Sequence, residues 1–280
     1  MKTVRVDTPW RRMAAAIFER PTDGKVAGIY DVDMTKMLAA MEIWNKEGHR
    51  VTPTHVMMSV LGHLLDTHAP ELNAYMRLGR VYHRPYINIS ASVLIDGKNL
   101  TSVCIQDVHQ KSVVDVADEL NEIVDRVRNK GNSSAKKEKP NLLAKTPWPL
   151  RKWIYNSLRW MVFEQGLPIK GIGLSEEMFG SAMVSNIGSL GIDYGIPALM
   201  PASNLSFVLA IGKVQEKAVV RDGKVCSAQV LPMAATFDHR VVDGGHIAKL
   251  VKGINYYFEH PEALCKPTSM IDLSSEETKS

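Results

Sequence analysis

The sequence is poor in cysteine. Its 280 residues include three, Cys104, Cys226 and Cys265, and none of them belongs to a Cys-x-x-Cys pair. An odd number without paired spacing argues against a disulfide framework and a cysteine zinc site, and it favours free thiols in a reducing compartment. His-Glu-x-x-His and other metal-binding spacings are absent as well, so we expect no metal.

Long hydrophobic runs are also absent. No stretch approaches the length of a membrane span, and the N-terminal residues 1–7 contain no apolar signal-peptide core, which together predict a cytoplasmic protein. The net charge of +4 is too small for a nucleic-acid-binding footprint, although it would suit a small anionic ligand. Neither a P-loop nor a Gly-x-Gly-x-x-Gly motif is present.

The remaining composition is that of a globular protein, with 45% hydrophobic and 23% charged residues. Alternating apolar residues predict strands over 86–95 and 100–105, and helical periodicity predicts helices over 52–68 and 112–127. Because strands and helices intermix and several hairpins are implied, the pattern favours an α+β fold in which helices cover a mixed sheet.

One short segment near the C-terminus contains the strongest candidates for catalytic residues. An apolar run over 229–237 reads as a strand, and residues 244–258 have helical periodicity. His239 lies at the junction between them, and an imidazole can transfer protons near neutral pH. Asp243 follows four residues later, which places both residues on one side of a turn.

The segment His239-Arg-Val-Val-Asp243-Gly resembles the active-site signature of dihydrolipoyl acyltransferases, the core enzymes of 2-oxo acid dehydrogenase complexes. Chloramphenicol acetyltransferase carries a related His-x-x-x-Asp-Gly. Further matching segments are Arg12-Met13, Val32–Lys36, Ser181–Gly188, Leu205–Gly212, Arg221–Lys224 and His260–Leu264. The resemblance covers residues 8–130 and 175–265, and it implies an α+β, chloramphenicol-acetyltransferase-like two-layer sandwich.

The same resemblance implies a set of site residues. His239 would be the general base, and the Ser185 hydroxyl would stabilise the oxyanion of the tetrahedral intermediate. Asp243 would pair with Arg12 and brace the histidine loop rather than act as the acid of a triad. The residues that would support the loop are Arg12, Asp238, Arg240 and Gly244.

The implied function is transfer of an acyl group between coenzyme A and a thiol, dihydrolipoyl-like, or hydroxyl acceptor. The implied assembly is a homotrimer or a higher assembly of trimers, with the histidine of one subunit facing the serine side of the next. Other dehydrogenase-complex subunits are candidate partners, and nucleic acid is not. Two alternatives stay open: a thioesterase or esterase using the same histidine, and a catalytically silent scaffold subunit.

The sequence also departs from the family pattern. No Asp-Lys-Ala lipoyl-lysine motif and no Ala/Pro linker occur, so we expect a single catalytic domain over 1–280 with no lipoyl group of its own. Residues 132–172 look like an insertion, and residues 149–163 can be drawn as an amphipathic helix carrying aromatic residues and cations. This segment could form a lid over the acyl channel, pack on the protein's own core or a neighbouring subunit, or contact a membrane surface through residues 148–163.

Overall fold

The computed structural model describes residues 24–95, 99–133, 145–167, 179–221 and 223–271. A seven-stranded mixed sheet forms its centre, in the order β1-β9-β7-β6-β4-β5, with β8 paired to β9. β4, β6 and β7 run parallel, and the other pairs are antiparallel. The strands are β1 Lys25–Asp33, β4 Ile89–Ile95, β5 Asn99–Ile105, β6 Ala182–Asn186, β7 Phe207–Ile211, β8 Gln215–Arg221 and β9 Lys224–Asp238.

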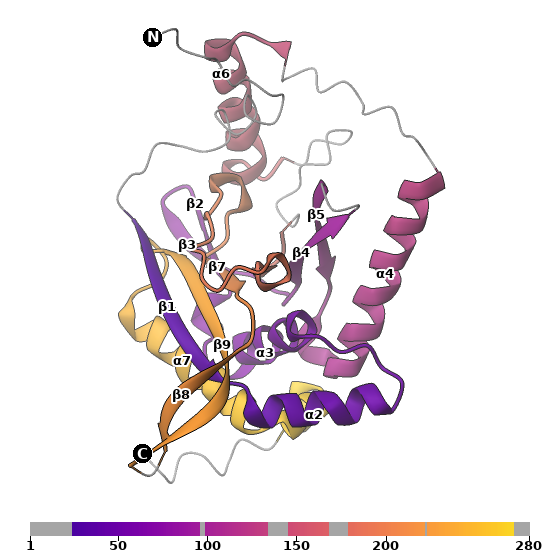
Figure 1. Cartoon of the computed structure of the whole chain (residues 1–280). Coiled ribbons are helices and arrows are strands. Elements are labelled where there is room, and N and C mark those ends of the chain that lie inside the picture. Colours follow the sequence, from indigo (N-terminus) through magenta and orange to yellow (C-terminus); the bar gives the residue numbers. More distant parts are fainter. Residues whose placement is uncertain (1–23, 96–98, 134–144, 168–178, 222, 272–280) are drawn as a thin grey trace, which may run out of the picture.

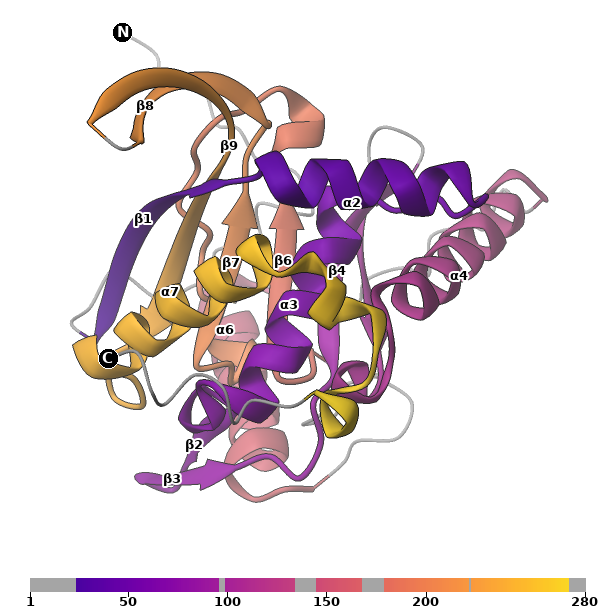
Figure 2. The same cartoon turned by 90° about the horizontal axis from the view of Figure 1, so that it is seen from below.

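Three helices cover one face of this sheet and a fourth flanks it beside β5 (Figures 1 and 2). These are α2 Thr35–Lys46, α3 Pro53–Thr67, α7 Gly244–Glu259 and the flanking α4 Val113–Ser133. A small hairpin of β2 Ala74–Arg77 and β3 Arg80–His83 stands apart from the sheet. Short helical turns connect these elements: η1 Pro70–Leu72, η2 Val108–Gln110, η4 Gly188–Leu190, η5 Pro201–Ser203, η6 Pro261–Cys265 and η7 Thr268–Met270.

A further helix lies on the other side of the sheet from α2, α3 and α7 (Figures 1 and 2). It is α6 Trp148–Arg159, which continues into one turn of π-helix, η3 Trp160–Glu164. Glu164 joins this segment to the small hairpin, because its carbonyl accepts from Arg77 Nε at 3.0 Å and its carboxylate accepts from the Leu78 N–H at 2.6 Å. The helix predicted over 149–163 is present and is one residue longer at each end, counting the π-helical turn.

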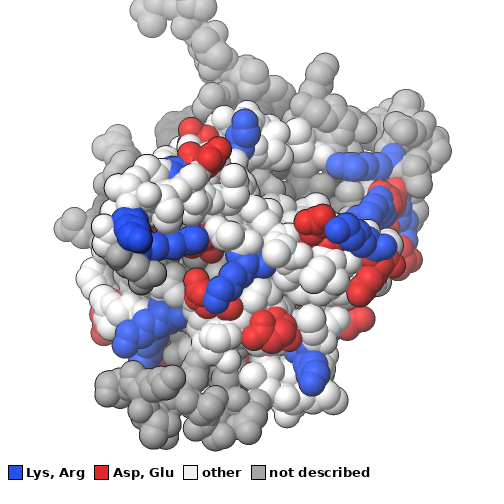
Figure 3. All heavy atoms as spheres, turned by 60° about the horizontal axis from the view of Figure 1, so that its bottom comes forward, with Lys and Arg blue, Asp and Glu red and all other residues white. Residues whose placement is uncertain are grey.

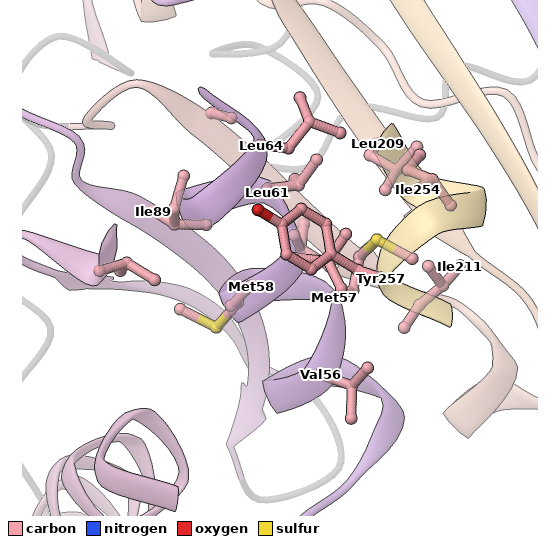
Figure 4. Close-up of a cluster of buried hydrophobic side chains, with 14 of the residues drawn as sticks. Val56, Met57, Met58, Leu61, Leu64, Ile89, Leu209, Ile211, Ile254 and Tyr257 are labelled. Atoms are coloured by element: carbon pink, nitrogen blue, oxygen red, sulfur yellow. The ribbon is translucent and has the colours of Figure 1, made fainter. Parts of the chain in front are cut away.

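Helix α3 is the centre of the hydrophobic core (Figure 4). It is buried along nearly its whole length, because the sheet lies on one side of it and α7 on another. Gly253 of α7 permits the close approach, since a Cβ there would lie 2.7 Å from Leu64 Cδ1. The core side chains drawn around α3 include Val56, Met57, Met58, Leu61, Leu64, Ile89, Leu209, Ile211, Ile254 and Tyr257.

The local signals in the sequence explain where these elements begin. Pro53 occupies the first turn of α3, and Thr52 and His55 form a reciprocal cap in which the His55 ring accepts from the Thr52 N–H at 3.0 Å. Ser112 and Asp115 form the corresponding cap of α4. The structure differs from the sequence prediction at the end of α4, because the helix predicted over 112–127 continues to Ser133.

The mixed sheet and its helical cover confirm the predicted α+β fold class. The N-terminal residues, including Arg12, lie outside the described residues. Within the part of the chain that is described, no helix combines the length and apolar character needed to span a bilayer.

His55 links the stability of this fold to pH. Burial is the main cause that lowers the pKa of His55 to about 4, so the ring stays neutral in the folded state at pH values where it is protonated in the unfolded chain. Stability from this residue is complete above its unfolded pKa of 6.5 and is lost as the pH falls toward 4. The loss at the lower end amounts to about 3 kcal/mol.

We expect His55→Gln to flatten this part of the pH dependence. A glutamine at the third helical position can keep the capping hydrogen bond but cannot be protonated. Urea unfolding of both proteins between pH 7 and pH 4.5 measures the difference. Parallel loss of unfolding free energy in the two proteins would show that His55 does not contribute.

Candidate active site

The strongest candidate for chemistry is the turn that joins β9 to α7. The His239 N–H donates to the Gly24 carbonyl at 2.6 Å, which ties the turn to the start of β1. The Val241 and Val242 N–H groups both donate to the Asp238 carbonyl at 2.9 Å, and the Val242 side chain is buried in the core. Backbone hydrogen bonds and the buried Val242 side chain thus fix the turn, and the His239 side chain itself is exposed.

The ring of His239 is oriented by one hydrogen bond. Its Nδ1 lies 2.7 Å from the Val242 carbonyl oxygen. A carbonyl oxygen can only accept, so Nδ1 carries the proton and the lone pair of the neutral ring is on Nε2. This arrangement presents Nε2 as a base at the surface of the subunit.

An ion pair supports the turn from the strand side. The Arg240 guanidinium donates twice to the carboxylate of Asp238, from Nε at 2.9 Å and from Nη2 at 2.6 Å. The Asp238 carboxylate also accepts from the Arg240 N–H at 3.0 Å. Because a bidentate pair restricts both side chains, Asp238 and Arg240 hold each other in place within the turn.

Asp243 has a different position from that of a triad acid. It is the N-cap of α7, where its carboxylate accepts from the N–H groups of Gly245 at 2.9 Å and His246 at 3.2 Å. These bonds, the one from His246 foremost, hold the pKa of Asp243 below its ordinary value. The predicted partner Arg12 lies outside the described residues, and Gly244 is the first residue of the helix.

Ser185 lies near the carboxyl end of β6. Its neighbours Ala182 and Val184 belong to the helix-covered core, so Ser185 lies on the opposite face of the sheet. The residues paired with it are small, Ser92 on β4 and Ala210 on β7. Small neighbours leave room above the half-buried hydroxyl.

The sheet register separates Ser185 from His239 within one subunit. Ser185 is opposite Ala210, Ala210 is opposite Ala234, and His239 lies five residues beyond Ala234 along β9. That offset is roughly 17 Å along the strands and roughly 10 Å across them. The two predicted catalytic residues are therefore not brought together by a single chain.

Two depressions are lined by sequence neighbours of these residues, Asn186 in one and Asp238 and Arg240 in the other, although neither Ser185 nor His239 is itself among the described lining residues. At the serine end, an open groove of about 630 Å³ includes Ser92, Asn186 and Thr54, and the cations Arg50 and Arg128. Two of these lining residues are bonded to each other, because the Asn186 side-chain amide donates to Thr54 Oγ1 at 2.9 Å. At the histidine end, a pocket of about 190 Å³ is lined by residues that include Lys25, Arg159, Asn204, Asp238 and Arg240.

Two features of this region were not predicted from the sequence. The Val242 carbonyl orients the His239 ring, and only its position three residues after His239 hints at that contact. Arg159 brings α6 to the pocket beside the histidine turn, which no local pattern in the sequence indicates. No group of three or more potential metal ligands occurs among the residues described.

Comparison with known families gives one match over most of the chain. The family model for 2-oxoacid dehydrogenases acyltransferase (catalytic domain) matches residues 3–137 and 171–266. The intervening segment, 138–170, contains all of α6.

Curated relatives are similar at a lower level of identity. The chain is 26% identical over 226 residues to the dihydrolipoyllysine-residue acetyltransferase component of the pyruvate dehydrogenase complex of Staphylococcus epidermidis, covering 80% of this chain and 42% of that protein. It is 24% identical over 218 residues to the corresponding component of the acetoin cleaving system of Bacillus subtilis, covering 78% and 44%. The chain thus spans less than half the length of these relatives.

Solved structures share the fold. A probable dihydrolipoamide acetyltransferase from Listeria monocytogenes superposes with a TM-score of 0.62 at 16% identity, covering 92% of this chain and 94% of that one. The dihydrolipoamide acetyltransferase of Azotobacter vinelandii gives 0.59 at 19%, with 86% and 83% covered. A chloramphenicol acetyltransferase gives 0.52 at 16%, with 84% and 88% covered, which confirms the predicted fold type.

Substitutions of Asp243 can separate the contribution of its helix cap to stability from the contribution of its negative charge. Asparagine is as good an N-cap as aspartate, whereas alanine is not, so we expect Asp243→Asn to keep the melting temperature and Asp243→Ala to lower it. Differential scanning calorimetry of the three proteins measures this. An equal loss in both variants would show that the negative charge itself, and not the cap, holds the turn.

Proposed function

Because the chain belongs to the 2-oxoacid dehydrogenase acyltransferase family, matching the model of its catalytic domain, we propose that it transfers an acyl group between coenzyme A and a thiol acceptor of the dihydrolipoyl class. The observation that carries this proposal is the His239 ring, whose bonded Nδ1 leaves Nε2 as a base on an anchored turn. Both curated relatives are named as dihydrolipoyllysine-residue acetyltransferases.

The proposed chemistry needs a base and an oxyanion donor. His239 Nε2 takes the proton of the acceptor thiol, and the resulting thiolate attacks the thioester carbonyl carbon of the acyl-coenzyme A. Ser185 Oγ–H donates to the oxyanion of the tetrahedral intermediate. The intermediate collapses with cleavage of the bond to the coenzyme A sulfur, and the imidazolium returns its proton to that sulfur.

The separation of Ser185 and His239 implies that the site is shared between subunits. Neither side chain can cover a gap of roughly 20 Å, so the histidine of one subunit would work with the serine of the next. The proposed assembly is therefore a trimer or a higher assembly of trimers. Cyclic symmetry gives every subunit the same pair of neighbours and completes every site.

A second similarity concerns the spacing of two residues in the histidine turn. The Azotobacter vinelandii structure concerns the role of a serine, a histidine and an asparagine in the catalytic mechanism, and there the histidine and the asparagine are four positions apart. His239 and Asp243 have the same spacing here. Asp243 would then support the turn through its cap, as asparagine can.

The groove at the serine end suits the nucleotide part of coenzyme A. Arg50 and Arg128 supply positive charge for phosphate groups, and Thr52 and Asn186 supply polar contacts. Arg50 also pairs with Asp125 at 2.7 Å, which fixes its guanidinium at the rim.

We expect release of free coenzyme A from an acyl-coenzyme A ester when dihydrolipoamide is present. His239→Ala should lower kcat by roughly 10²–10⁴-fold, and Ser185→Ala by roughly 10²-fold or more with the fold intact. Chromatographic separation of free coenzyme A from its ester, over a panel of esters, measures the release and identifies the acyl group. Release that does not require the dithiol would point to hydrolysis, and no release with any ester would contradict the proposal.

Mixing the two inactive variants tests the shared site directly. If His239→Ala and Ser185→Ala subunits are unfolded together and reassembled, roughly a quarter of the sites in random trimers contain an intact histidine and an intact serine. We expect about that fraction of wild-type activity, with reassembled wild type as the reference. Activity no higher than that of either variant refolded alone would place both residues in one subunit.

A further inference from the structure

Helix α6 presents an apolar face to solvent. The Trp153 and Trp160 side chains are 68% and 54% exposed, and they lie seven residues apart, on one side of the helix. Leu150, three residues before Trp153, is exposed too, and Trp148 is exposed at the first turn. These exposures contradict packing of the aromatic face on the protein's own core, whereas packing on a neighbouring subunit, the other part of the sequence-based interpretation, stays a prediction.

The opposite face of the same segment is the one that packs. Arg151, Tyr155, Val162 and Phe163 are buried, and Arg151 donates to the Thr146 carbonyl at 2.7 Å. The segment is thus held in place by its inner face, which leaves the indoles free for an external partner. A cluster of exposed aromatic side chains on one element marks a contact surface.

The charges around this face have a single sign. From 145 to 163 the chain has no aspartate or glutamate and four cationic residues; Arg151 is on the buried inner face, so Lys145, Lys152 and Arg159 supply the remaining positive charge. Lys152 Nζ lies 5.8 Å from the centre of the Trp148 ring, at the edge of the apolar face. The face of the molecule that bears α2 and α7 is different, since cations and acids alternate over it (Figure 3) and pair, as Lys36 does with Glu259 at 2.6 Å.

We propose that α6 is a membrane-surface helix that docks the protein on an anionic lipid bilayer. Indoles place their apolar body among the acyl chains and their N–H among the headgroups, and cations beside them attract anionic lipids. Twelve residues of helix are about 18 Å long, which is too short to cross a bilayer, so α6 lies in the plane of the interface.

A second copy of the same helix is a poorer partner. Two α6 helices related by a twofold axis would bring their lysines and arginines together, which opposes association. The segment is also outside the two regions matched by the family model, so its surface does not follow from membership of the family.

The test is co-sedimentation of the full chain with lipid vesicles. We expect binding to vesicles of phosphatidylcholine with phosphatidylglycerol, weaker binding to phosphatidylcholine alone, and loss of the difference at high salt. Trp153→Ser combined with Trp160→Ser should reduce the binding by about tenfold or more. Val220→Ser combined with Val225→Ser is the matched control, because these side chains are as exposed but lie on the β8–β9 hairpin.

A charge series completes the design. Lys145→Gln with Lys152→Gln should weaken binding to the anionic vesicles, whereas Lys224→Gln with Lys252→Gln removes the same charge elsewhere and should not. Wild-type protein that stays in the supernatant with anionic vesicles overturns the proposal, as does equal binding by the tryptophan pair variant. A tryptophan variant that changes the assembly mass in lipid-free ultracentrifugation assigns the face to a protein contact instead, which also overturns it.

Discussion

The register of three neighbouring strands is the constraint on which the proposed chemistry depends. Pairing of β6 with β7, and of β7 with β9, sets Ser185 at one end of the sheet and His239 beyond the other. A shift of register by one residue would turn each side chain to the opposite face, so the buried residues of β9 hold the alignment. The core that α3 and α7 form against the sheet therefore determines where the functional groups lie, although none of its residues takes part in the chemistry.

Much of the fold could be predicted from the sequence because its local signals agree with one another. Alternation predicted β4 and β5, and the Thr52-Pro53 pair marked the start of α3. The helix predicted after His239 matches α7 within one residue, whereas β9 begins five residues before the predicted strand. The end of α4 was missed, because the polar residues after Arg128 resemble a loop in composition, while the helix continues through them. Polar composition alone does not end a helix when no proline or cap interrupts it.

The candidate site was predictable in its residue types but not in its geometry. The motif identified His239 and Asp243, whereas the roles of their neighbours depend on contacts that no spacing reveals. The bond from the histidine ring to the Val242 carbonyl depends on the shape of one turn, and the cap formed by Asp243 depends on where α7 begins. The burial of α6 could not be predicted either, since periodicity shows that a helix has two faces but not which of them meets the protein.

Division of the proposed site between subunits would have a consequence for how the protein behaves in dilute solution. When the two halves of each proposed site belong to different chains, an isolated subunit has no complete site, and catalysis follows the mass action of assembly. Specific activity would then rise with protein concentration until association is saturated. The local concentration of the chain, and not only that of its substrates, would set the rate of acyl transfer in a cell.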